Sequence, residues 1–192
     1  MNTLRFKFLA LVFVCAVAVL AAGYDRTRTP SLAVIDGGRN FTAGQAPDVR
    51  FTTLSEQSHS LRELSAPVVL LHFWASWCAP CLVEFPALLS MVERYEGQVA
   101  LVAVSIDEDP AKMNRALDRL KETHGALMEQ PFFYWTNDPE ERISKDLFDV
   151  VRVPETIVLN VRRDMIAKFA GETDWSSEEV RAEIERALRP SL

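Results

Sequence analysis

Two cysteines separated by two residues, Cys78 and Cys81, are the side chains of this 192-residue chain whose spacing most directly implies chemistry. A thiol pair at this spacing can close into a disulfide and reopen by thiol–disulfide exchange. The same spacing occurs in zinc sites, but a site of four thiolates needs a second cysteine pair. The remaining cysteine, Cys15, lies in an apolar leader. The sequence therefore favours a redox switch.

The segments on either side of the pair predict where each sulfur lies. Residues 68–73 form a continuous apolar run, typical of a strand buried on both faces, and residues 81–95 repeat apolar side chains at helical spacing. Cys78 then stands at the N-terminal end of a helix, where free backbone N–H groups stabilise a thiolate. We expect Cys78 to attack a substrate, and the more buried Cys81 to resolve the mixed disulfide.

After residue 45 the chain alternates strands with helices. This order predicts an α/β domain with a central mixed β-sheet flanked by helices and an N-terminal β-hairpin extension. Strands are expected at 49–54 and 56–61 in the hairpin, and at 68–73, 99–106, 132–135, 156–159 and 165–170 in the sheet. Helices are expected at 81–95, from Asp109-Pro110, from Asp138-Pro139 with Ile143 and Leu147 inward, and from a capping box of Ser176 and Glu179.

The N-terminus has the composition of an export signal. Arg5 and Lys7 precede an uninterrupted apolar run over residues 8–22. We expect residues 1–23 to be a signal anchor or a signal peptide, 24–45 a linker, and 46–192 the domain. The domain would lie on the periplasmic side of the inner membrane, anchored by its N-terminal segment, or be soluble in the periplasm after cleavage of the signal.

The charge balance bears on the partners of the protein. The chain has 27 acidic and 21 basic residues and a formal net charge of −6 at pH 7. This balance argues against nucleic acid as a partner. We expect no metal and no bound cofactor, because the redox-active disulfide Cys78–Cys81 would itself carry the electrons.

Three motifs together resemble the thioredoxin superfamily. They are FWASWCAPC at 73–81, APD at 46–48 and VPET at 153–156. The sequence is most similar to the extracytoplasmic, membrane-anchored TlpA/ResA/CcmG-like branch of thiol-disulfide oxidoreductases, and the resemblance covers about residues 46–190. It implies a thioredoxin-like fold and protein-disulfide reductase activity.

The resemblance also implies how a substrate is held. Pro154 would be a cis-proline facing the dithiol, although an ordinary trans proline opening a strand is the alternative. Val153 would then pair its backbone with an extended substrate segment. Trp77, with Ala79 and Pro80 of the dithiol loop, would complete the docking surface.

Glu84 lies three residues past Cys81, and therefore on the helix face near the cysteines. In the family, a glutamate at this place in CxxCxxE is linked to thiol protonation. One hypothesis is therefore a carboxyl group with a raised pKa that accepts or returns the proton of Cys81. The alternative is a solvated glutamate in the first helical turn, stabilised by the helix dipole.

His72 departs from the family pattern. It occupies the strand position where cytoplasmic thioredoxins carry a buried aspartate and this branch often an asparagine. An imidazole at this position could relay protons to Cys81. The alternative is a neutral core residue that only forms hydrogen bonds.

The resemblance further implies a client and an electron source. Apocytochrome c is the implied substrate, because its haem-attachment cysteines must be free thiols, and a membrane electron donor would re-reduce the protein. One alternative is a copper chaperone or a copper-site thiol reductase that uses the cysteines as soft ligands. A thiol peroxidase fits less well, because Cys78 lacks the expected Pro-x-x-x-Thr-x-x-Cys arrangement.

Overall fold

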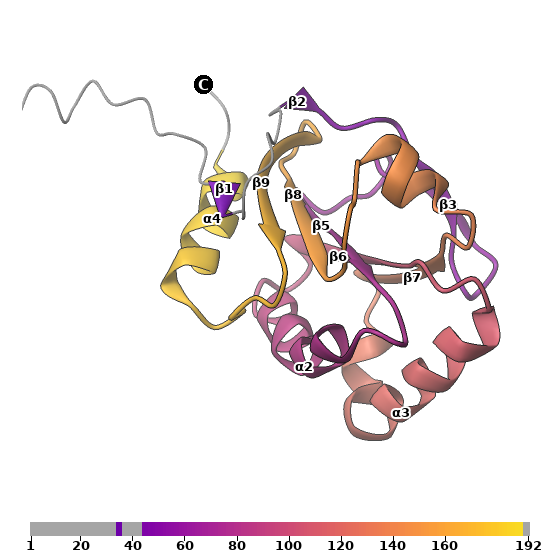
Figure 1. Ribbon diagram of the computed structural model, residues 1–192. Coiled ribbons are helices and arrows are strands. Elements are labelled where there is room, and N and C mark those ends of the chain that lie inside the picture. The colour runs from indigo at the N-terminus through magenta and orange to yellow at the C-terminus, as the bar shows by residue number, and fades with distance from the viewer. Residues whose placement is uncertain (1–33, 36–43, 190–192) are drawn as a thin grey trace, which may run out of the picture. The chain divides into compact units, whose positions relative to one another are not determined.

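A mixed β-sheet forms the centre of this computed structural model, which describes residues 34–35 and 44–189 (Figure 1). Seven strands take part. Along the sheet they follow the order β1 (Val34–Ile35), β9 (Asp164–Ala170), β8 (Glu155–Leu159), β5 (Val68–Trp74), β6 (Val99–Ser105) and β7 (Phe133–Asn137), while β2 (Gly44–Gln45) pairs with β9. Strands β5, β6 and β7 are parallel, and β8 runs antiparallel to β5. The predicted central mixed sheet is confirmed.

Both faces of the sheet are covered, which explains the continuous apolar runs of β5 and β6. Every residue of these two strands is buried. One face packs against the helices α2 (Ala79–Glu93), α3 (Pro110–Met128) and α4 (Glu178–Leu188), as Figure 1 shows. The other face is covered by residues 46–66 and by Phe148 and Val150. The first of these segments contains the predicted N-terminal hairpin, formed by β3 (Arg50–Thr52) and β4 (Ser58–Ser60).

Two predicted helices differ in detail from the structure. The segment after Asp138 forms a π-helix, η1 (Arg142–Leu147), and the Asp138 carboxylate accepts hydrogen bonds from two N–H groups at its start, those of Ile143 and Ser144. Leu147 was expected inward, but it is 45% exposed. The last helix is capped by Ser177, because Ser176 is held in a turn by Asp174.

The N-terminal part of the chain is described only in places. The predicted signal segment 1–23 lies outside the described residues. Two short strands, β1 and β2, fall within 24–45, where a linker is predicted, and both pair with β9. The sheet thus includes residues that precede the predicted start of the domain. Within the described ranges, no helix is long and apolar enough to cross a membrane.

A buried arginine joins the entry segment of the domain to the C-terminal hairpin. Arg163 is 5% exposed and lies between β8 and β9. Its guanidinium donates hydrogen bonds to five backbone carbonyls, those of Leu61, Leu64, Ala66, Pro67 and Asn160. Four of these carbonyls belong to the stretch 61–67 that leads into β5. The cation is therefore satisfied by peptide dipoles, and it fixes the path of the chain into the central strand.

We predict that Arg163→Met lowers the free energy of unfolding by about 3 kcal/mol, because it leaves buried carbonyls without donors. Urea titration of the oxidised domain measures the loss. The matched control is Arg162→Met, whose 62% exposed side chain pairs with Asp164 and which should cost less than about 1 kcal/mol. Equal losses in the two variants would show that the carbonyl contacts do not stabilise the fold.

Candidate active site

The cysteine pair lies at the junction between β5 and α2, as the sequence predicts. Cys78 is the N-cap of α2, and its sulfur accepts a hydrogen bond from the Cys81 N–H at 3.3 Å. The two cysteines form a disulfide, with Cys78 5% exposed and Cys81 fully buried. In the reduced state, the same N–H and the helix dipole would stabilise a thiolate on Cys78. The attacking role of Cys78 and the resolving role of Cys81 stay a prediction.

The loop before the cysteines is held by Asp107, a residue that the sequence analysis did not single out. Its buried carboxylate accepts hydrogen bonds from the Ser76 N–H at 2.8 Å and the Ser76 hydroxyl at 2.7 Å. The Ser105 hydroxyl donates a third, at 2.8 Å. Ser76 and Asp107 follow the parallel strands β5 and β6, whose carboxyl ends meet at one edge of the sheet. That shared edge was a usable sequence signal.

The segment that precedes β8 brings the predicted proline to the same region. The Val153–Pro154 peptide bond is cis, so the trans alternative is wrong. Strand pairing aligns Glu155 with Phe73, which places Pro154 beside the end of β5 from which the dithiol loop departs. Pro154 itself is buried, and its carbonyl accepts a hydrogen bond from the Gly171 N–H at 2.8 Å.

Large apolar side chains are exposed on the dithiol loop and on the segment before the cis-proline. Trp77 is 67% exposed, and Ala79 and Pro80 are also exposed. Val153 is half-buried, while Val151, two residues earlier, is 56% exposed. The residues predicted for docking thus lie on the dithiol loop itself and on the segment that precedes the cis-proline. Their role in binding a substrate stays a prediction.

Glu84 is buried in the core one helical turn beyond Cys81. It is 5% exposed, and its Oε2 atom accepts a hydrogen bond from the Thr173 N–H at 3.0 Å. Burial raises the pKa of Glu84 to about 7, and nearby Glu172 raises it further, while the Thr173 N–H and the Trp175 indole lower it. The alternative of a solvated glutamate is therefore wrong. Its exchange of a proton with Cys81 stays a prediction.

His72 is fully buried in β5 and contacts Glu84. Its Nε2 atom lies 3.8 Å from Glu84 Oε1, and its Nδ1 atom lies 2.8 Å from the Thr156 hydroxyl on β8. The ring packs edge-on against Phe85 at 5.2 Å between centroids and against Trp175 at 6.5 Å. Burial lowers the pKa of His72 to about 3, so the imidazole is neutral at physiological pH.

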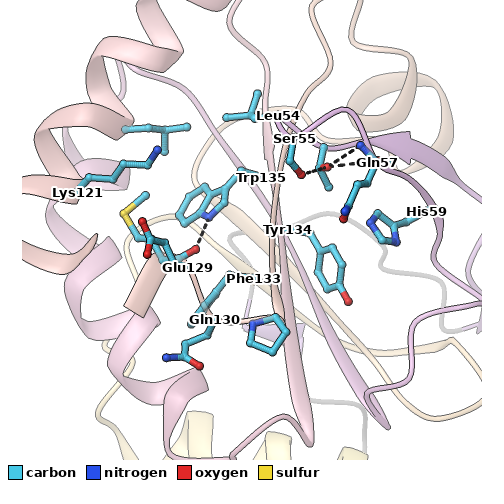
Figure 2. Close-up of a pocket in the computed structure, with 14 residues that line it drawn as sticks. Leu54, Ser55, Gln57, His59, Lys121, Glu129, Gln130, Phe133, Tyr134 and Trp135 are labelled. Atoms are coloured by element: carbon cyan, nitrogen blue, oxygen red, sulfur yellow. Dashed lines mark hydrogen bonds between the residues drawn. The ribbon is translucent and has the colours of Figure 1, made fainter. Parts of the chain in front are cut away.

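A separate cavity of about 530 Å³ lies between the N-terminal hairpin, α3 and β7 (Figure 2). Figure 2 shows Lys121 on one side and Gln57 and His59 on the other. None of the predicted site residues lines this cavity. The dithiol site therefore does not lie in this cavity.

Comparison with known proteins agrees with the fold and the site. A family model described as Thioredoxin-like matches residues 67–165. The DsbE homolog of Paracoccus denitrificans, a thiol:disulfide interchange protein, is 31% identical over 150 residues, which are 75% of this chain and 75% of that protein. The thiol-disulfide oxidoreductase ResA of Bacillus subtilis is 26% identical over 163 residues, covering 84% of this chain and 80% of ResA.

Two further comparisons are partial or distant. The thioredoxin-like protein YneN of Bacillus subtilis is 44% identical over 61 residues, which are 32% of this chain and 36% of YneN. The crystal structure of StoA from Bacillus subtilis superposes with a TM-score of 0.57 at 19% identity, covering 73% of this chain and 98% of StoA. The chain belongs to the thioredoxin-like family, in its TlpA/ResA/CcmG group of thiol-disulfide oxidoreductases.

We predict an unusual pH dependence of stability in the oxidised protein, whose cysteines do not titrate. For Glu84, the pKa is about 7 when folded against 4.5 when unfolded, so its contribution is complete below pH 4.5 and is lost towards pH 7. For His72, the pKa is about 3 when folded against 6.5 when unfolded, so its contribution is complete above pH 6.5 and is lost towards pH 3. The two slopes cancel between pH 4.5 and 6.5.

Single substitutions should remove this cancellation. With Glu84→Gln, stability relative to the parent should rise with pH between 4.5 and 6.5 by about 1.4 kcal/mol per pH unit. With His72→Gln, it should fall with the same slope over the same interval. Urea titrations at several pH values give the free energy of unfolding for each variant. Subtracting the parent curve removes the contribution of the other carboxyl groups to its pH dependence. Flat difference curves would mean that neither group titrates as described.

Proposed function

We propose that this thiol-disulfide oxidoreductase reduces disulfides of extracytoplasmic proteins. The observation that carries the proposal is the Cys78–Cys81 pair at the N-terminus of α2, with a buried carboxyl group one turn behind it. The N-terminal position favours a thiolate on Cys78, the nucleophile of exchange. Glu84, whose pKa burial raises to about 7, is suited to exchange a proton near neutral pH.

The reaction transfers two electrons and two protons to the substrate. The Cys78 thiolate attacks one sulfur of a protein disulfide, forming a mixed disulfide and releasing the other sulfur as a thiolate that takes up a proton. The Glu84 carboxylate then accepts the proton of the Cys81 thiol. The Cys81 thiolate attacks Cys78 Sγ, which closes the Cys78–Cys81 disulfide and expels the second substrate sulfur. The proton held by Glu84 returns to that sulfur, so the substrate leaves as a dithiol.

The open surface around the cysteines suits an extended, partly apolar polypeptide. Trp77 and Val151 offer large exposed apolar side chains, and the backbone of Val153 precedes the cis-proline. A substrate strand paired with Val153 would bring its own disulfide to Cys78, because strand addition aligns two backbones along a fixed line. The exposure of these side chains supports the docking role proposed for Trp77, Ala79, Pro80 and Val153.

The proposed location and direction rest on the sequence. The basic and apolar leader over residues 1–23 supports export, with the domain held at the periplasmic side of the inner membrane. Ala79 and Pro80 add no charge that would strongly stabilise the Cys78 thiolate, which disfavours a powerful oxidant. In an oxidising compartment, a reductant needs an electron source, which we propose is a membrane donor. Apocytochrome c is the candidate client.

A copper-handling protein is the alternative hypothesis from the sequence. Cysteine thiolates are soft ligands that suit copper(I). In the part of the chain that the structure describes, no group of three or more His, Cys, Asp or Glu side chains is placed to hold a metal ion.

We predict that Cys81→Ser traps a covalent complex with a disulfide substrate, because the resolving sulfur is missing. Non-reducing electrophoresis with an oxidised model peptide measures the trapped species. Cys78→Ser is the matched control and should trap little, since Cys81 is fully buried. Equal trapping by the two variants would contradict the assigned order of attack.

The reduction potential tests the proposed direction. Thiol trapping of the exported domain in graded dithiothreitol buffers should give a value of about −270 mV or lower, near that of thioredoxin. Such a value lets the protein reduce client disulfides when a membrane donor supplies electrons. A value near about −120 mV, typical of a strong oxidant, would overturn the reductant proposal.

A further inference from the structure

Three buried polar side chains form a path along one face of the sheet. Glu84 on α2 contacts His72 on β5, and His72 contacts Thr156 on β8. His72 and Thr156 are directly paired residues of neighbouring antiparallel strands, so their side chains share one face of the sheet. Thr156 lies two residues after the cis-proline. The path therefore runs from the dithiol helix to the strand that begins at the predicted substrate-binding segment.

The Glu84–His72 contact is enclosed. The His72 side chain is fully buried, the Glu84 side chain is 3% exposed, and the atoms that face each other are 3.8 Å apart. Neither His72 Nε2 nor Glu84 Oε1 has a hydrogen-bond partner among the described residues. Catalytic hydrogen bonds are often long in resting structures and shorten during the reaction. Two buried polar atoms that face each other favour such a bond, and Trp175 Nε1, a third buried atom without a hydrogen-bond partner, also acts on the Glu84 carboxylate.

A neutral imidazole can serve Glu84 in both of its charge states. If Nδ1 carries the ring proton and donates to Thr156, then Nε2 accepts a hydrogen bond from a protonated carboxyl group. If Nδ1 instead accepts from the Thr156 hydroxyl, then Nε2–H donates to an ionised carboxylate. The Thr156 hydroxyl allows both arrangements, because it can either donate or accept.

Folding also changes which member of the pair holds a proton. In the unfolded chain near pH 5.5, the histidine is protonated and the glutamate ionised, as their ordinary pKa values of 6.5 and 4.5 require. Burial lowers the pKa of His72 and raises the pKa of Glu84, so the folded pair is neutral, with the proton on the carboxyl group. This avoids two buried charges at one place in the core.

We propose that His72 is a positioning residue for Glu84, which it holds against the dithiol helix as a neutral hydrogen-bond partner in both the protonated and the ionised state. Glu84 can then take the proton of Cys81 and give it up again without being left unpaired in the core. The inference rests on the proposed function of the dithiol, because it assigns His72 a role in the same proton exchange.

Few other polar groups surround the pair. Glu172 is the charged residue that acts on Glu84 from the loop between β9 and α4, and the Thr173 N–H and the Trp175 indole act from the same loop. On α2 itself, Cys81 is the titratable neighbour when the protein is reduced. Among the described residues of β5, His72 is the one whose side chain contacts the Glu84 carboxylate. A substitution of His72 should therefore change the pKa of Glu84 directly.

The experiment follows the protonated carboxyl group of Glu84 by difference infrared spectroscopy across pH, in the oxidised protein. The carbonyl band is assigned by its loss in Glu84→Gln, and in the parent it should titrate near the pKa of about 7. In His72→Leu, the ionised carboxylate keeps the Thr173 N–H but loses the imidazole donor at Oε1, so the midpoint should rise by about one pH unit or more. In His72→Gln, the side-chain amide can still donate or accept, so the midpoint should stay within about half a unit of the parent.

Thr156→Val provides a second test that keeps the imidazole. It removes the hydroxyl that orients the ring and should move the Glu84 midpoint upward, by less than His72→Leu does. The matched control is Thr136→Val, which also removes a buried hydroxyl, one that donates to the Thr52 carbonyl away from Glu84. The control should leave the midpoint unchanged.

An unchanged Glu84 midpoint in both His72→Leu and Thr156→Val, accompanied only by lower thermal stability, would overturn the proposal and leave His72 a packing residue. If His72→Leu does not fold, Thr156→Val against Thr136→Val decides the question alone. The infrared readout needs no disulfide substrate. If Cys81→Ser traps no disulfide substrate while His72→Leu still shifts the Glu84 midpoint, the proposed function is contradicted and the positioning role of His72 stands.

Discussion

The burial of β5 on both faces is the constraint from which the arrangement of the site follows. A strand at the centre of a mixed sheet must pack apolar side chains above and below, and all seven of its residues are buried. The dithiol loop therefore starts at the carboxyl end of β5, at the edge of the sheet. Helix α2 begins directly after this loop and covers one face of the sheet. The single polar side chain within β5, that of His72, is left in the core with only protein groups to contact.

Because His72 and Glu84 are both buried, the charge of each group strongly affects the free energy of the folded state. An unpaired buried charge is costly, and a buried ion pair recovers its desolvation only with excellent geometry. The structure meets this cost by keeping His72 neutral and by surrounding Glu84 with an N–H group, an indole and an imidazole. A carboxyl group that remains protonated to near-neutral pH is thereby placed one turn from a buried thiol. The contacts that make these buried groups tolerable in the core are therefore the ones on which the proposed proton exchange would depend.

Much of the fold could be predicted from the sequence because its signals are local. The apolar run before Cys78, the helical spacing after Cys81 and the Asp109-Pro110 helix start each depend on neighbouring residues only, and each agrees with the structure. The environment of Glu84 could not be predicted in this way, since Thr173, its backbone partner, is 89 residues further along the chain. Arg163 was missed for the same reason, while Asp107 could have been found from its place at the carboxyl end of β6, beside that of β5. The partners of Arg163 are backbone carbonyls, which leave no pattern of side-chain types.

Arg163 also bears on the order in which the protein can form. Its guanidinium reaches carbonyls of the entry segment across 96 to 102 residues of sequence. A ribosome makes that segment, together with the N-terminal hairpin, long before it makes the arginine that fastens it. Contacts of such long range are slow to form, because the loop between them must first close. The contacts of Arg163 with the entry segment can therefore form only at a late step of folding, after most of the chain has been synthesised.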